Sequence, residues 1–130
     1  MMKKGLNPFL KNYAYHYKNK IDAEFLNSQA QSFVGTHDFS AFCASGSTVE
    51  DTVRTIYSFS VQRNGDEVDF IVEGNGFLYN MVRIMVGSLI EISEKRIEKD
   101  TLADIILSKD RLKAGRTVPA CGLYLNKVIF

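Results

Sequence analysis

The feature that most constrains the fold is a long apolar run that contains a single arginine. Within Phe77–Ile92, helical spacing places the polar or small positions on one narrow stripe, namely Asn80, Arg83, Gly87 and Glu91. All other sides are apolar, which predicts a helix that a folded domain buries on most of its surface. The run is shorter than the roughly 20 residues that a bilayer requires and it carries two charges, so no membrane-spanning helix is expected.

Arg83 raises the question of what its guanidinium faces. The stem could pack on its neighbours while the head reaches water. Alternatively the group faces a half-buried cleft, where it needs a carboxylate or phosphate because a desolvated cation without a partner is costly. Within the helix, the i+4 position is Gly87, which has no side chain, and Glu91 lies two turns away. Any buried partner would therefore come from elsewhere in the chain or from another molecule.

Alternation of apolar and polar side chains predicts four strands, at residues 12–18, 52–63, 67–73 and 123–130. In the second strand, one face is expected to carry Val53, Thr55, Tyr57, Phe59 and Val61, with Ile56 on the opposite face. In the third strand, the inner face is expected to carry Val68, Phe70 and Val72, while Glu67, Asp69 and Glu73 point outward. Asn64-Gly65 between these two strands predicts a two-residue hairpin turn, because both turn positions require a positive φ.

Helix signals complete the order of elements. Asp22 is a predicted N-cap for a helix that closes at Gly35, and a short helix is predicted over residues 100–108 with Leu102, Ile105 and Ile106 inward. Residues 36–51 and 109–120 are predicted loops. The resulting βαββαβ order predicts one α+β, ferredoxin-like domain over residues 1–130, with a four-stranded antiparallel sheet and helices on one face.

The charge balance excludes a protein that is basic overall. The formal net charge is +1, so any nucleic-acid site must be local. The one concentrated basic patch is the segment Lys109–Arg116, which is either a solvated loop or a contact for a nucleic-acid backbone. The cysteines, Cys43 and Cys121, are far apart and are expected to be reduced in a cytoplasmic protein. With only two histidines in the chain, no spacing suits a metal site, and neither a metal nor a cofactor is expected.

Other functional patterns are weaker. His37-Asp38 is interpreted as a hydrogen-bonded pair that packs a loop rather than a catalytic pair. A row of tyrosines, Tyr13, Tyr15 and Tyr17, is compatible with a free-standing RNA-binding module of the RRM type, in which bases stack on a sheet. The acidic side chains of the third strand oppose that interpretation, because they would repel phosphates. A structural or oligomerisation domain without RNA affinity is a third alternative.

Five strings, taken in order, are similar to those of a known family. The chain resembles the C-terminal half of the tRNA pseudouridine synthase A (TruA) family in NPFLKNYAYHY (residues 7–17), GTHDFSAFCASG (35–46), VRTIYS (53–58), EGNGFLYNMVRIMVGSLIEI (73–92) and AGRTVPACGLYL (114–125). The resemblance implies two ferredoxin-like halves around a positively charged cleft. It also implies conversion of uridine to pseudouridine in the anticodon stem-loop of tRNA, and a homodimeric full-length protein.

The family nucleophile is an aspartate in an A-G-R-T-D motif of the N-terminal half, which is absent here. The string Ala114–Thr117 is followed by Val118 and is interpreted as a coincidence. The isolated chain is therefore predicted to be inactive.

The resemblance also assigns residues to a site. Arg83 matches the family arginine that pairs with the catalytic aspartate, and Leu123 matches a residue that lines the uracil pocket. Predicted contacts to the tRNA backbone are Arg54, Lys109, Arg111, Lys113 and Arg116. Cys43 stands where the family often has an arginine, which predicts one contact fewer.

Overall fold

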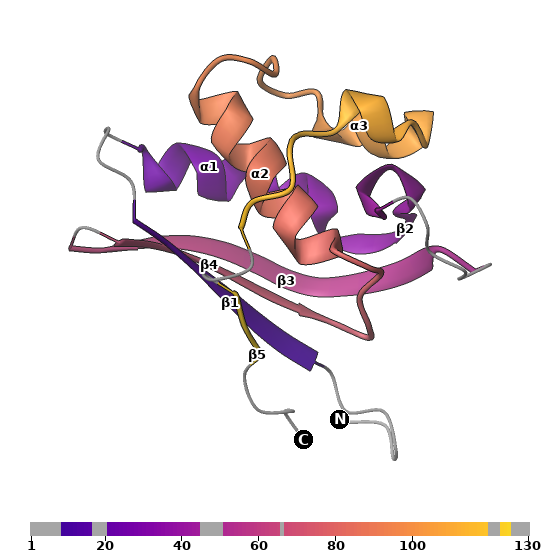
Figure 1. Ribbon diagram of the computed structural model, residues 1–130, viewed down its shortest axis with the longest axis horizontal. Coiled ribbons are helices and arrows are strands. Elements are labelled where there is room, and N and C mark those ends of the chain that lie inside the picture. The colour runs from indigo at the N-terminus through magenta and orange to yellow at the C-terminus, as the bar shows by residue number, and fades with distance from the viewer. Residues whose placement is uncertain (1–8, 17–20, 45–50, 66, 120–122, 126–130) are drawn as a thin grey trace.

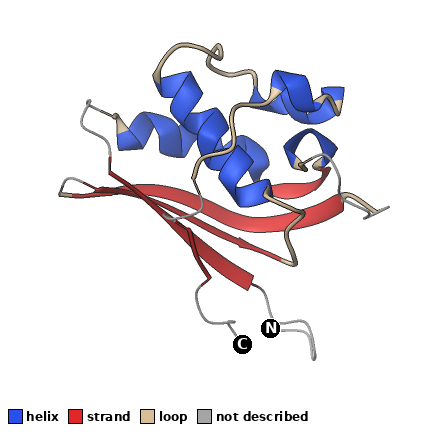
Figure 2. Ribbon diagram, viewed as in Figure 1, coloured by secondary structure: helices blue, strands red, loops and turns tan. Residues whose placement is uncertain are grey.

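The structure, a computed structural model, describes residues 9–16, 21–44, 51–65, 67–119 and 123–125, without the side chains of residues 15, 16 and 123–125. Its strands are β1 (Phe9–His16), β2 (Gly35–Asp38), β3 (Val53–Asn64), β4 (Glu67–Gly74) and β5 (Leu123–Leu125). Its α-helices are α1 (Ala23–Ala30), α2 (Met81–Ser93) and α3 (Leu102–Ser108). Short 3-10 turns occupy Gln31–Phe33, Ser40–Phe42 and Arg111–Lys113. All three α-helices lie on one face of the sheet (Figures 1 and 2).

The sheet has the order β2-β3-β4-β1-β5, and every pair is antiparallel. The strands β3, β4, β1 and β5 form the four-stranded ferredoxin-like arrangement that the sequence predicts, so the fold class is confirmed. The additional edge strand, β2, lies within the segment that was predicted to be a loop, and it pairs with β3 from Gly35↔Ile56 to Asp38↔Val53. The predicted fourth strand is described only over Leu123–Leu125.

The predicted side-chain alternation of β3 is wrong in its first half. The register between β3 and β4 shifts between Ile56 and Ser58, which leaves Tyr57 as the extra residue of a β-bulge. Ile56 is therefore buried on the core face, whereas Val53 and Tyr57 are exposed at 45% and 50%. Beyond the bulge, Phe59 and Val61 are buried as predicted. A bulge inverts the alternation because side chains in a strand change face at every residue.

The hairpin between β3 and β4 is confirmed, but its turn lies one residue later than predicted. Asn64 pairs with Glu67, so Asn64 is the last residue of β3 and the two loop positions are 65 and 66. Gly65 has a φ of +64°, which glycine adopts without a steric penalty. In β4, Val68, Phe70 and Val72 are buried as predicted, while Asp69 is buried rather than exposed.

The helices match their sequence signals except at the end of the first one: α1 ends at Ala30, a 3-10 turn follows over Gln31–Phe33, and Gly35 begins β2 rather than closing the helix. The Asp22 carboxylate accepts a hydrogen bond from the Phe25 N–H over 3.1 Å, which confirms the predicted N-cap. Helix α3 buries Leu102, Ile105 and Ile106. Helix α2 is buried over almost its whole length, and its largest buried side chains, Met81, Ile84, Met85 and Leu89, fill the space above the sheet. Helix α2 therefore forms the centre of the helical layer and fixes the position of the residues on its polar stripe.

Candidate functional site

The polar stripe of α2 is covered by the chain itself. The segment Ala114–Val118, here called the strap, runs along α2 at Gly87 and Ser88. A β-carbon on Gly87 would lie 1.7 Å from the carbonyl oxygen of Arg116, and one on Gly115 would lie 2.6 Å from the Cα of Ser88. The Ser88 hydroxyl accepts a hydrogen bond from the Gly115 N–H over 2.8 Å. The backbones meet only because both glycines lack a side chain.

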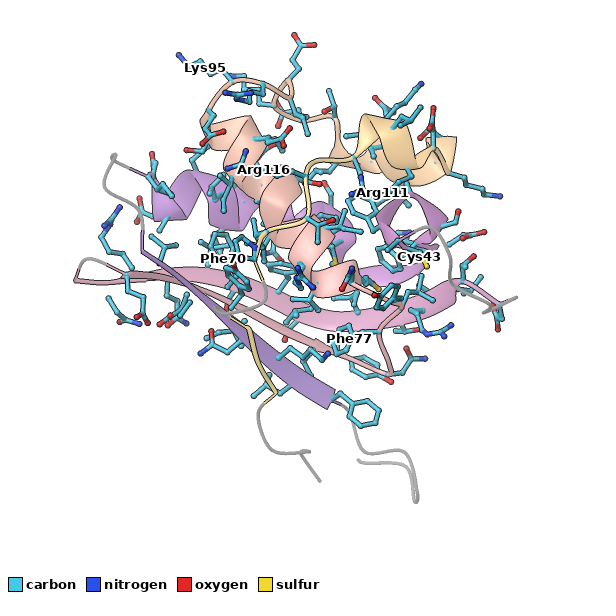
Figure 3. All side chains as sticks on the ribbon, in the orientation of Figure 1. Cys43, Phe70, Phe77, Lys95, Arg111 and Arg116 are labelled. Carbon is cyan, nitrogen blue, oxygen red and sulfur yellow. The ribbon has the colours of Figure 1, made fainter. Side chains whose placement is uncertain are left out.

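The strap also accounts for the motif that was interpreted as a coincidence. Within the strap, Arg116 binds the end of α2 through both its own backbone N–H and its guanidinium. Its N–H donates to Glu91 Oε2 over 2.9 Å, and its guanidinium lies 3.1 Å from Glu94 Oε1 and 3.5 Å from Glu91 Oε2. The cluster lies beside α2 in Figure 3. Ala114–Thr117 therefore serves packing of the strap on α2 in this chain.

Arg83 is oriented by two neutral acceptors. Its Nε donates to the carbonyl oxygen of Val118 over 2.8 Å, and one terminal nitrogen donates to Asn80 Oδ1 over 2.9 Å. The Arg83 carbonyl oxygen in turn accepts from the Val118 N–H over 3.3 Å, so two hydrogen bonds join Arg83 to Val118 of the strap. Among the described residues, no carboxylate forms an ion pair with Arg83. The remaining N–H donors of its guanidinium therefore stay available to an anion.

A cleft of about 260 Å³ lies at the amino end of α2. Its lining includes Arg83 and consists of Lys11 and residues 77–83. The arginine is half-buried and faces this cleft, which is the second of the two orientations that the sequence left open. We call this concavity the Arg83 cleft.

Asn80 is a site residue that the sequence reasoning missed. It precedes the first residue of α2 and has a left-handed backbone with φ +60°, yet its side chain does not cap the helix. Asparagine at this position ordinarily accepts a bond from the first turn of the helix. Here the side-chain oxygen of Asn80 accepts from Arg83 instead. Asn80 therefore orients the guanidinium and does not stabilise the start of the helix. The signal in the sequence was an asparagine three residues before the buried arginine.

A second concavity adjoins the Arg83 cleft and shares Lys11 and Phe77 with it. This Arg54 concavity measures about 660 Å³, and its remaining lining residues are Phe9, Asp51, Val53, Arg54, Asn75 and Gly76. The predicted tRNA contact Arg54 thus lines a concavity that adjoins the Arg83 cleft, and its guanidinium donates to the carbonyl oxygens of Asp51 and Val53, both over 2.8 Å. The structure brings these two predicted site residues to one side of the molecule.

The basic loop is not a uniform cationic surface. Arg111 folds back on the strap and donates to the Gly115 carbonyl over 2.9 Å and to the Thr117 hydroxyl over 3.2 Å. Lys109 lies 3.8 Å from Asp38 Oδ2, and Lys113 is exposed. With Arg116 paired to α2, three of the four predicted loop contacts carry a structural interaction. Their contact with tRNA stays a prediction.

The weaker patterns resolve into structural roles. The Asp38 carboxylate accepts from the Thr52 hydroxyl over 2.6 Å and from the Ser40 N–H over 3.1 Å, and the Thr52 bond holds the pKa of Asp38 below its usual value. The His37 ring lies 3.1 Å from the Val34 carbonyl oxygen. His37 and Asp38 therefore hold local structure around β2, but they bond to other residues and not to each other, so the predicted His37–Asp38 pair is wrong.

Tyr13 is buried in the core, and its hydroxyl donates to the Pro119 carbonyl over 2.6 Å, so it cannot act as a stacking platform. The side chains of Tyr15, Tyr17 and Leu123 lie outside the described part of the structure.

Two further features bear on function. Within the described residues, no group of three or more His, Cys, Asp and Glu side chains gathers where a metal ion could bind. Every described helix is too short or too polar to cross a membrane.

Comparison with known proteins gives concordant matches. A family profile described as tRNA pseudouridine synthase matches residues 29–130. A tRNA pseudouridine synthase A of Thermoanaerobacter sp. (strain X514) is 46% identical over 123 residues, which make up 95% of this chain and 50% of the relative. The protein of that name from Acetivibrio thermocellus is 48% identical over 121 residues, or 93% of this chain and 50% of the relative. That from Clostridium acetobutylicum is 45% identical over 120 residues, or 92% and 49%. The chain thus spans about half the length of these relatives.

Proposed function

The chain belongs to the tRNA pseudouridine synthase family, and we propose that it acts as the C-terminal half of an enzyme that isomerises uridine to pseudouridine in the anticodon stem-loop of tRNA. A separate N-terminal half would supply the nucleophilic aspartate. The observation that carries this proposal is the state of Arg83. Its guanidinium faces a cleft, is held by two neutral acceptors, and has no carboxylate paired with it among the described residues.

The proposed role of Arg83 follows from its charge and its orientation. A carboxylate that enters the cleft beside a guanidinium stays ionised, because the opposite charge stabilises its anionic form. An ionised and oriented carboxylate is what a nucleophile requires. The bonds to Val118 and Asn80 fix the guanidinium before the carboxylate arrives, so little reorganisation is needed when it does.

The isomerisation itself is balanced within the nucleotide. The bond between N1 of uracil and C1′ of the ribose breaks, a bond between C5 and C1′ forms, and the proton on C5 is exchanged for one on N1. No electrons are gained or lost, so the reaction needs no redox cofactor, and none is proposed. The target base must leave the RNA stack to reach the aspartate, and we propose that Arg83 also helps to occupy the space that the base vacates.

The remaining assignments belong to the same proposal. Leu123 lines the uracil pocket, and the tRNA anticodon arm contacts Arg54 together with the basic loop residues Lys109, Arg111, Lys113 and Arg116. The full-length protein is a homodimer that works in the cytoplasm. Of the predicted backbone contacts, Arg54 has the strongest support, since it lines the concavity next to the Arg83 cleft.

The proposal is tested with a full-length protein that contains this chain and the N-terminal half. Arg83→Ala is expected to lower kcat for pseudouridine formation at least about 100-fold while changing tRNA affinity less than about threefold, because the arginine acts on the nucleophile. The matched control is Arg96→Ala, which removes an exposed arginine just beyond the far end of α2. Equal losses of turnover and affinity in Arg83→Ala would contradict the assigned role.

The isolated chain gives a second test. Incubated with unmodified tRNA, it is expected to form no pseudouridine, because the nucleophile belongs to the other half. Addition of the separately produced N-terminal half is expected to restore product. Pseudouridine formed by the 130-residue chain alone would refute the assignment of the nucleophile.

A further inference from the structure

Lys11 is a second cation at the Arg83 cleft, and neither the resemblance nor the comparisons assign it a role. It lies on β1 two residues before the buried Tyr13, so its side chain leaves the same face of the sheet as the core, at the open end beneath the start of α2. It lines both the Arg83 cleft and the Arg54 concavity. Its ammonium lies 5.5 Å from the centre of the Phe77 ring, which separates the two concavities. Figure 3 shows Phe77 below the ribbon of β3, beside the loop that joins β4 to α2.

The positive charge of Lys11 has no carboxylate partner in the described part of the structure. Among the described residues, no acidic group forms an ion pair with Lys11. The acid among the residues that line the Arg54 concavity is Asp51, and it accepts from the backbone N–H of Val53 over 3.0 Å. Burial lowers the pKa of Lys11, which means that the site disfavours the ammonium in the absence of an anion. The ring of Phe77 offsets only a small part of this cost.

The chemistry of the cleft favours a phosphate as the missing partner. The planar fork of Arg83 suits a carboxylate or a phosphate, and the ammonium of Lys11 is a compact point charge that binds phosphate oxygens from any direction. The Arg54 concavity adds a third cation and measures about 660 Å³, within the range of about 300 to 1,000 Å³ typical of small-ligand sites. Phe77 presents a half-buried ring at its wall, and such rings stack on bases.

We propose that Lys11 binds an RNA phosphate next to the nucleotide that enters the Arg83 cleft, with the backbone of the RNA continuing along the Arg54 concavity. This inference rests on the proposed function, because it takes the ligand to be RNA. It also assigns different roles to the two cations of the cleft. Arg83 interacts with the carboxylate that performs the chemistry, and Lys11 fixes the register of the substrate backbone.

The test measures binding of an RNA anticodon stem-loop to the 130-residue chain over a series of salt concentrations. Lys11→Gln is expected to weaken binding about fivefold and to reduce the slope of log K against log salt by about 1, as loss of one phosphate contact predicts. The loss should be the same for a stem-loop of different loop sequence, because a phosphate contact carries no base information. Lys11→Arg keeps the charge and is expected to retain most of the affinity.

The matched control is Lys95→Gln, which removes one positive charge at the opposite end of α2, far from Phe77 in Figure 3. This variant is expected to leave affinity and salt slope unchanged. Circular dichroism of each variant shows whether its fold is retained, and Lys11→Arg reports on the charge if Lys11→Gln does not fold.

Three results would overturn the inference: an unchanged salt slope in Lys11→Gln, an equal loss in Lys95→Gln, or no RNA binding by the unaltered chain. A fourth is a loss of association with the N-terminal half in Lys11→Gln without a loss of RNA binding, since the anion would then be a carboxylate of that half. Pseudouridine formation is measured separately on the full-length protein. If RNA binds through Lys11 but no pseudouridine forms, the proposed function fails while the RNA contact stands.

Discussion

Replacing Gly87 with alanine tests how closely the strap packs on α2. The added β-carbon would lie 1.7 Å from the Arg116 carbonyl oxygen and 2.8 Å from its carbonyl carbon. Both are backbone atoms, so no side-chain rotation relieves the clash, and the strap has to move away from α2. Within a helix, alanine would otherwise stabilise relative to glycine by about 1 kcal/mol. The two effects have opposite signs, which makes the outcome informative.

The expected loss of stability follows from the hydrogen bonds between the strap and α2. Four hydrogen bonds join the backbone of the strap to α2, from Val118 N–H to the Arg83 carbonyl, from Arg83 Nε to the Val118 carbonyl, from Gly115 N–H to Ser88 Oγ, and from Arg116 N–H to Glu91. At about 1 kcal/mol each, their loss costs about 4 kcal/mol. Subtracting the gain of about 1 kcal/mol in helix propensity leaves a destabilisation of about 3 kcal/mol.

The assay is urea denaturation followed by circular dichroism, since the chain contains no tryptophan. The matched control is Gly76→Ala, whose β-carbon would meet only the Arg54 side chain at 3.6 Å and 3.7 Å, an ordinary contact. It is expected to change the free energy of unfolding by less than about 0.5 kcal/mol. If Gly87→Ala stabilises the protein by the propensity difference alone, the close approach of the strap to α2 is refuted.

Two further predictions concern residues outside the cleft. Tyr13→Phe is expected to cost about 1 kcal/mol in urea denaturation, because the Pro119 carbonyl oxygen loses a hydrogen bond of 2.6 Å, and an unchanged stability would contradict that bond. Asp38→Asn tests how stability depends on pH. In the folded protein the pKa of Asp38 lies below its ordinary value of 3.8, chiefly because the carboxylate accepts from the Thr52 hydroxyl. The contribution of Asp38 to the free energy of unfolding is therefore complete above pH 3.8 and is lost as the pH falls through the folded pKa. The stability gap between wild type and Asp38→Asn should therefore be constant at neutral pH and narrow below pH 3.8, and Thr52→Val should shrink it; a gap independent of pH would contradict the assignment.

The elements that the sequence predicted correctly are those that depend on near neighbours in the chain. Asp22 caps α1 through a bond that spans three residues, and the buried face of α3 follows from helical spacing. The inner face of β4 follows from alternation, since that strand has no bulge. In β3 the same rule failed, because the bulge at Tyr57 depends on how β3 pairs with β4.

The residues of the candidate site were likewise only partly predictable from the sequence. The sequence singled out Arg83 and showed that its own helix offers no partner, but it left open whether the guanidinium reaches water or faces a cleft. It did not identify Asn80, whose side chain turns from the helix end to the arginine, or Lys11, which joins the cleft from a strand more than sixty residues earlier. It also presented the four cations of the basic loop as equivalent, whereas the structure pairs Arg116 with Glu91 of α2 and with Glu94, which follows the helix.

By itself, the sequence determined the α+β fold class, the burial of α2 and the family, since each depends on the pattern of residues along the chain. Only the tertiary structure decided what covers the stripe of α2, which cations share a cleft, and which of them are already paired. Those properties depend on contacts between segments far apart in sequence. The approach of the strap to Gly87, closer than any side chain would allow, is set by packing and leaves no periodic signal in the chain.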